Sequence, residues 1–168
     1  MRVKICGITR LEDALLAEAL GAFALGFVLA PGSRRRIAPE AARAIGEALG
    51  PFVVRVGVFR DQPPEEVLRL MEEARLQVAQ LHGEEPPEWA EAVGRFPSRR
   101  RAWAKPLLAT GRRVILAGGI APENLEEVLA LRPYALDLAS GVEEAPGVKS
   151  AEKLRALFAR LASLRMEG

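Results

Sequence analysis

Short apolar runs alternate along the chain with longer segments of mixed polarity. Each apolar run has the length and composition of a strand, and the segment after it carries apolar residues at the spacing of one helical face. Six such strand–helix units are readable. The predicted strands cover residues 2–6, 23–29, 52–59, 76–81, 113–120 and 134–139.

The predicted helices follow the strands directly. Thr9 and Glu12, three residues apart, resemble a capping box at the start of the first helix. Prolines stand near the start of later helices, where a missing N–H is tolerated. The predicted helices cover residues 10–22, 39 onward, 64–75, 87–95, 122–131 and 151–164. Alternation of this kind, with near-continuous apolar strands, predicts an α/β fold built on a parallel sheet.

Glycines and polar or reactive side chains follow every predicted strand. In parallel α/β folds the chemistry gathers at the carboxyl ends of the strands, in open sheets and closed barrels alike. We therefore expect the functional site at this edge of the sheet. The six strand ends read Cys6-Gly7, APGSRR at 30–35, FRD at 59–61, QLHG at 80–83, Gly118-Gly119 and Ser140-Gly141.

Composition narrows the class of protein. With 168 residues, 49% of them hydrophobic and 27% charged, the chain is typical of one soluble globular domain. The net charge is only +2, and the arginine runs at 34–36 and 99–101 lack interleaved aromatics, so we expect no nucleic-acid partner. No apolar run is long enough to span a bilayer, so we expect no membrane partner and a cytoplasmic location. One Asn and three Gln beside many Arg and Glu is a bias of heat-adapted proteins.

Two successive strand ends predict a phosphate site. Gly118-Gly119 and Ser140-Gly141 lie in neighbouring loops and offer backbone N–H groups to one anion. Tight turns without a ligand are the alternative reading of each pair.

The motifs also carry a family resemblance. They are KICGIT at 4–9, FVLAPGSRRRIAPE at 27–40, VGVF at 56–59, QLHG at 80–83, LAGGIAPEN at 116–124 and DLASGVEEAPGVKS at 137–150. In this order they resemble phosphoribosylanthranilate isomerase. The resemblance implies a (βα)8 TIM barrel without cofactor or metal, and a dimer is common among heat-adapted members. The implied reaction is the Amadori rearrangement of N-(5-phosphoribosyl)anthranilate to 1-(2-carboxyphenylamino)-1-deoxyribulose 5-phosphate, in tryptophan biosynthesis.

The same resemblance implies the site residues. It makes Cys6 the general base and Arg35 the clamp for the anthranilate carboxylate, and it places Gly118, Gly119, Ser140 and Gly141 at the phosphate. Gln80 and His82 are expected at the floor or rim of the pocket, and Asp137 is expected to be structural. From strand alternation alone, Lys4 shares a face with Cys6 and is expected to favour its thiolate.

The middle of the chain departs from the family pattern. After Phe96 the sequence PSRRRAW leads directly toward a predicted helix around Trp103, so strand five, helix five and strand six are expected to be absent. The general acid, an aspartate at the end of strand six in the family, is absent with them. We expect one barrel-type domain over 1–168 with a gap near 97–102. Either the chain carries a real deletion, or the molecule contains a stretch that the printed sequence omits.

Two other functions stay open on the sequence. One is another phosphosugar enzyme of the barrel class that shares the phosphate loops. The other is a non-catalytic or impaired phosphosugar-binding barrel, which the missing acid favours.

Overall fold

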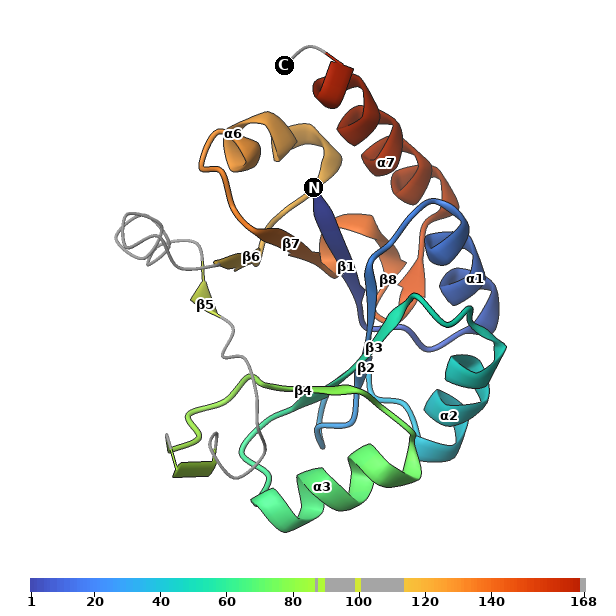
Figure 1. Ribbon diagram of the computed structural model, residues 1–168, viewed down its shortest axis with the longest axis vertical. Helices are drawn as coiled ribbons and strands as arrows, with labels where there is room; N and C mark the ends of the chain where they lie inside the picture. The colour runs from blue at the N-terminus through green and yellow to red at the C-terminus, as the bar shows by residue number, and fades with distance from the viewer. Residues whose placement is uncertain (87, 90–98, 101–113, 167–168) are drawn as a thin grey trace.

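A curled parallel sheet forms the centre of the molecule. The computed structural model describes residues 1–86, 88–89, 99–100 and 114–166. Adjacent strands are parallel, in the order β4-β3-β2-β1-β7-β6-β5, with β4 and β5 at the two ends of the curve (Figure 1). The strands are β1 (Arg2–Cys6), β2 (Ala24–Val28), β3 (Val54–Phe59), β4 (Val78–Leu81), β5 (Arg99–Arg100), β6 (Ile115–Ala117) and β7 (Ala135–Leu138).

Helices cover the outer face of this sheet (Figure 1). Each follows a strand, as the alternation predicted, and the right-handed crossovers of a parallel sheet place it outside. The helices are α1 (Leu11–Ala19), α2 (Pro39–Ala48), α3 (Pro64–Glu73), α6 (Leu125–Leu129) and α7 (Ala151–Met166), with 3-10 turns at Pro122–Asn124 and Ser140–Val142. Within the described residues, no helix has the length and apolar character that a membrane span requires.

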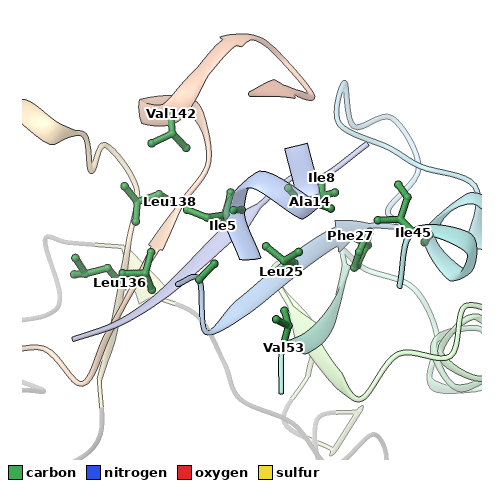
Figure 2. Close-up of a cluster of buried hydrophobic side chains, with 14 of the residues drawn as sticks. Ile5, Ile8, Ala14, Leu25, Phe27, Ile45, Val53, Leu136, Leu138 and Val142 are labelled. Atoms are coloured by element: carbon green, nitrogen blue, oxygen red, sulfur yellow. The ribbon is translucent and has the colours of Figure 1, made fainter. Parts of the chain in front are cut away.

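The core lies between the sheet and these helices. Ile5 of β1 stands in register with Leu25 of β2 on one side and with Leu138 of β7 on the other. All three side chains are fully buried and gather in the cluster of Figure 2. Burying each stabilises the fold by about 1.5–3 kcal/mol. Because side chains alternate along a strand, the neighbours Lys4 and Cys6 face the opposite, concave side.

One prediction about local structure is wrong. Helix α1 begins at Leu11 with Arg10 at its N-cap and no side-chain capping bond. Thr9 instead donates its hydroxyl to the carbonyl oxygen of Gly147, far along the chain. The stretch near 97–102, where the sequence predicts a gap in the family pattern, contains β5, which pairs in parallel with β6. This end of the sheet is therefore formed by β5.

Other predictions fall on parts of the chain outside the described residues. Nearly all of the helix predicted at 87–95 lies there, and so does the helix predicted around Trp103. A segment not predicted at all follows the last sheet strand. It is an antiparallel hairpin of β8 (Glu143–Ala145) and β9 (Val148–Lys149).

Candidate active site

A cleft of about 960 Å³ opens at the carboxyl ends of the strands. The sheet therefore brings together residues that lie up to 134 positions apart in the sequence. Seven of the eight predicted site residues line the cleft, namely Cys6, Arg35, Gln80, His82, Gly118, Gly119 and Ser140. The eighth, Gly141, is not among the lining residues. A Cβ at this position would collide with the carbonyl oxygen of Ile120, so glycine allows the two loop backbones to pack closely.

Cys6 ends β1 and is partly buried beneath the cleft. Its register partner on β2 is Gly26, and a Cβ at that position would lie 2.8 Å from the Cys6 sulfur. Glycine thus provides the space that the thiol occupies. Val28 and Val58 lie in the small apolar cluster against which Cys6 packs.

This setting raises the pKa of the Cys6 thiol. Burial has the largest effect and disfavours the thiolate; the Lys4 ammonium acts against it, while Asp137 adds to the rise. Lys4 favours the thiolate, as predicted, but burial outweighs its effect on the pKa of Cys6. A thiol with a raised pKa is less ionised near neutral pH, and its thiolate is the stronger base.

Lys4 anchors a buried polar network under the cleft. Its Nζ donates to Asp137 Oδ2 at 2.8 Å and to Gln80 Oε1 at 2.7 Å. Gln80 Nε2 lies 3.3 Å from the same Asp137 oxygen. The Cys6 and Asp137 charges raise the pKa of Lys4 against its burial, so it stays an ammonium. Asp137 therefore accepts hydrogen bonds from a cation, which fits the structural role predicted for it.

Arg35 crosses the end of β1. Gly7 has a φ of +79°, and a Cβ there would lie 2.6 Å from the Arg35 side chain, so glycine is required for this crossing. The Arg35 guanidinium donates three hydrogen bonds to the Glu143 carboxylate. Nε donates to Oε1 at 2.9 Å and to Oε2 at 3.0 Å, and Nη2 donates to Oε2 at 2.7 Å. Arg34 and Arg36 are exposed, as expected of solvated neighbours.

Sequence reasoning missed Glu143 and Lys149. Both come from the β8–β9 hairpin and form an ion pair at 2.7 Å, with side chains 4% and 0% exposed. Lys149 Nζ also donates to the backbone carbonyl of Cys6. Both residues lie inside the motif DLASGVEEAPGVKS, but nothing in its letters shows that its charges point inward.

The predicted phosphate loops lie at the exposed rim of the cleft. Gly118 and Gly119 follow β6 with φ values of +88° and +65°, and apart from adjoining residues no atom of the described residues lies within 4 Å of the position where a Cβ of either would stand. Their N–H groups donate to no backbone carbonyl in the described part of the chain. Ser140 opens the 3-10 turn after β7 and is also exposed.

His82 is exposed at the end of β4, where its backbone N–H donates to the carbonyl oxygen of Phe59 at 2.9 Å.

Asp61, Glu66 and Asp137 are the acidic residues among those that line the cleft. β5, which pairs with β6, consists of Arg99 and Arg100, and a guanidinium group does not release its proton at working pH. Among described residues, no three metal-ligating side chains cluster.

A curled parallel sheet with a polar cleft at its carboxyl ends defines a barrel-type α/β enzyme. Comparison with known proteins gives the family. The model of the N-(5'-phosphoribosyl)anthranilate (PRA) isomerase family matches residues 3–108 and 104–160. The chain belongs to this family, whose members are isomerases of tryptophan biosynthesis.

Individual relatives agree. The chain is 39% identical to N-(5'-phosphoribosyl)anthranilate isomerase of Geobacter sulfurreducens, over 95% of this chain and 98% of that protein. The crystal structure of phosphoribosyl anthranilate isomerase from Thermus thermophilus is 80% identical, covers 98% of this chain and all of its own, and has a TM-score of 0.93. A structure in complex with reduced 1-(o-carboxyphenylamino)-1-deoxyribulose 5-phosphate is 36% identical, covers 97% of this chain and 99% of its own, and has a TM-score of 0.89.

The chain also differs in length from the Geobacter relative. The Geobacter alignment spans 198 positions, more than the 168 residues of this chain, so that relative contains residues without a counterpart here. The two segments matched by the family model meet at 104–108, close to the gap predicted near 97–102.

Proposed function

We propose that the cleft binds N-(5-phosphoribosyl)anthranilate and that the chain converts it to 1-(2-carboxyphenylamino)-1-deoxyribulose 5-phosphate. The observation that carries this proposal is the convergence of Cys6, Arg35 and the two glycine-rich loops on one cleft. The substrate has a carboxylate at one end and a phosphate at the other. Arg35 and the Gly118–Gly119 loop are the groups suited to these two anions.

The proposed reaction is a sequence of proton transfers. Protonation of the furanose oxygen opens the ring and leaves an iminium, and a base then removes the C2′ proton to give an enolamine. The enolamine tautomerises to the ketone as C1′ gains a proton and the hydroxyl on C2′ loses one. Cys6 is the proposed base, since it lies in the cleft at the end of β1 and its thiolate can accept a proton. Lys4 favours the thiolate that the step requires.

A second candidate function is binding without turnover. It is favoured by a specific observation: β5 offers Arg99 and Arg100, not an aspartate, beside β6. A missing general acid typically lowers the rate by a factor of about 10²–10⁴. Assaying the rearrangement with the parent chain decides between the two, because conversion supports the first candidate and analogue binding without conversion supports the second.

Substituting Arg35 tests the binding mode. Arg35→Ala should weaken binding of the reduced product analogue by about tenfold or more, because a charged hydrogen bond to its carboxylate is lost. If turnover is measurable, KM should rise more than kcat falls, since the carboxylate is held in ground and transition states alike. The measurement is calorimetric titration.

Arg43→Ala is the matched control, because Arg43 also pairs with a glutamate, at 3.0 Å, but lies on the exposed face of α2. The control should bind the analogue like the parent. If Arg35→Ala and the parent bind the analogue with equal affinity, the role of Arg35 in binding the substrate carboxylate is contradicted.

We also propose a cytoplasmic homodimer. Support comes from the two ends of the sheet, β4 and β5, which do not pair with each other among the described strands. A similar structure from Thermotoga maritima, 34% identical over 97% of this chain, with a TM-score of 0.87, is described as monomers generated from a dimeric isomerase.

A further inference from the structure

A buried ion pair in the β8–β9 hairpin contacts both proposed functional residues. Lys149 is fully buried, and its ammonium has two partners: Glu143 Oε1 at 2.7 Å and the backbone carbonyl oxygen of Cys6. The second bond holds the end of β1 in place. The position of the Cys6 backbone, and with it the thiol, thus depends on a residue 143 positions away.

Glu143 makes the corresponding contact to Arg35. Both of its carboxylate oxygens accept from the guanidinium, and Oε1 also accepts from the backbone N–H of Gly147 at 3.2 Å. An arginine has five N–H donors in a planar fork. Glu143 accepts from the donors on one edge of the fork, Nε and Nη2. Nη1 has no hydrogen-bond partner in the part of the chain that the structure describes. The fork is therefore fixed while one side stays available to an anion.

Stability alone does not explain this arrangement. Taking two charges out of water carries a penalty of several kcal/mol per ion, and well-packed apolar residues are often as stabilising. What the pair adds is rigidity between three loops, those after β1, β2 and β7. Their anchor atoms are the Cys6 carbonyl, the Arg35 guanidinium and the Glu143 carboxylate.

We propose that the Glu143–Lys149 ion pair is a positioning unit for the active site, in which Glu143 orients Arg35 toward the substrate carboxylate and Lys149 fixes the strand end that carries Cys6. The assignment of substrate to this cleft rests on the proposed function. Neither residue touches the reacting atoms in this account.

The Glu143 half is tested by a double-mutant cycle on analogue affinity. Glu143→Gln should weaken binding of the reduced product analogue about tenfold, because a neutral amide holds the fork less firmly. In an Arg35→Ala background the same substitution should have no further effect, since Glu143 acts through Arg35. Glu47→Gln, which removes an exposed partner of Arg43, is the control and should leave the affinity unchanged.

The outcomes separate this inference from the proposed function. If Arg35→Ala weakens binding but Glu143→Gln does not, or if the two effects add, the positioning role of Glu143 is wrong while the clamp stands. If Arg35→Ala itself changes nothing, the clamp is wrong and the role of Glu143 is overturned with it.

The role proposed for Lys149 can be tested without substrate. Alkylation of Cys6 by iodoacetamide reports its thiolate, and the charges facing that thiol are Lys4, Asp137, Lys149 and Arg35. Lys149→Met should move the alkylation midpoint to higher pH because a nearby cation is gone. Glu143→Gln should move it the other way. A purely structural role would lower the melting temperature without opposite shifts of this kind.

Folding is checked on the same samples by thermal unfolding. If Lys149→Met does not fold, the double variant Lys149→Met/Glu143→Gln, which leaves neither member of the buried pair charged, takes its place, and its midpoint is compared with that of Glu143→Gln alone, so that only the charge at position 149 differs. An unchanged alkylation midpoint in the folded variant would overturn the role of Lys149.

Discussion

Cys6 and Arg35 illustrate what single residues reveal. The letters CG after an apolar run placed Cys6 at a strand end, and the structure puts it in the cleft. The partner of Arg35 was beyond prediction, since Glu143 lies 108 positions away and pairs with it only after the sheet has formed. The net shift of the thiol pKa was also beyond reach, because it depends on burial by Val28 and Val58, which periodicity does not measure.

The raised pKa of Cys6 gives a prediction on pH. The thiolate is the reacting form, so the rate of alkylation should rise with pH to a midpoint above about 8.5, the value of an unperturbed thiol. Glutathione alkylated in the same buffers is the control. A midpoint at or below that of glutathione would show that the protein stabilises the thiolate instead.

Elements with a clear apolar period were predictable, and those held by polar contacts were not. The predicted strand 2–6 is β1 without change, and the strand predicted at 113–120 shortens to Ile115–Ala117, where the glycines begin. The β8–β9 hairpin has no apolar run. Its position comes from Glu143 and Lys149, whose partners lie in other loops.

The loops after β6 and β7 are predicted to bind phosphate. Inorganic phosphate should bind between Gly118-Gly119 and Ser140-Gly141, because the exposed glycine N–H groups lack backbone partners in the described residues. A crystal soaked in phosphate should show the anion there. An empty site with phosphate bound elsewhere would contradict this assignment.

At the scale of the whole molecule, the parallel fold was predictable from the alternation of elements, but its edges were not. The sheet does not end at β6, because the two residues of β5, Arg99 and Arg100, pair in parallel with it. The sheet still ends at β4 and β5, and exposed edges favour pairing with another chain.

Native mass spectrometry tests both the length of the chain and its assembly. The denatured protein should weigh 18.2 kDa if the shorter middle segment is real, and the native species should weigh twice that. A denatured mass larger by several kDa would show that the printed sequence omits residues. A native species at the mass of one chain, under conditions that preserve a known dimer, would contradict the homodimer.

The central claim is that Cys6 takes the substrate proton in this cleft. Turnover of N-(5-phosphoribosyl)anthranilate by the parent and by Cys6→Ala, measured with the melting temperature of both, tests it most directly. The account predicts measurable turnover by the parent, a reduction of about 10²–10⁴-fold in the variant and little change in stability. A parent without turnover, or a folded variant within a few-fold of an active parent, would contradict it.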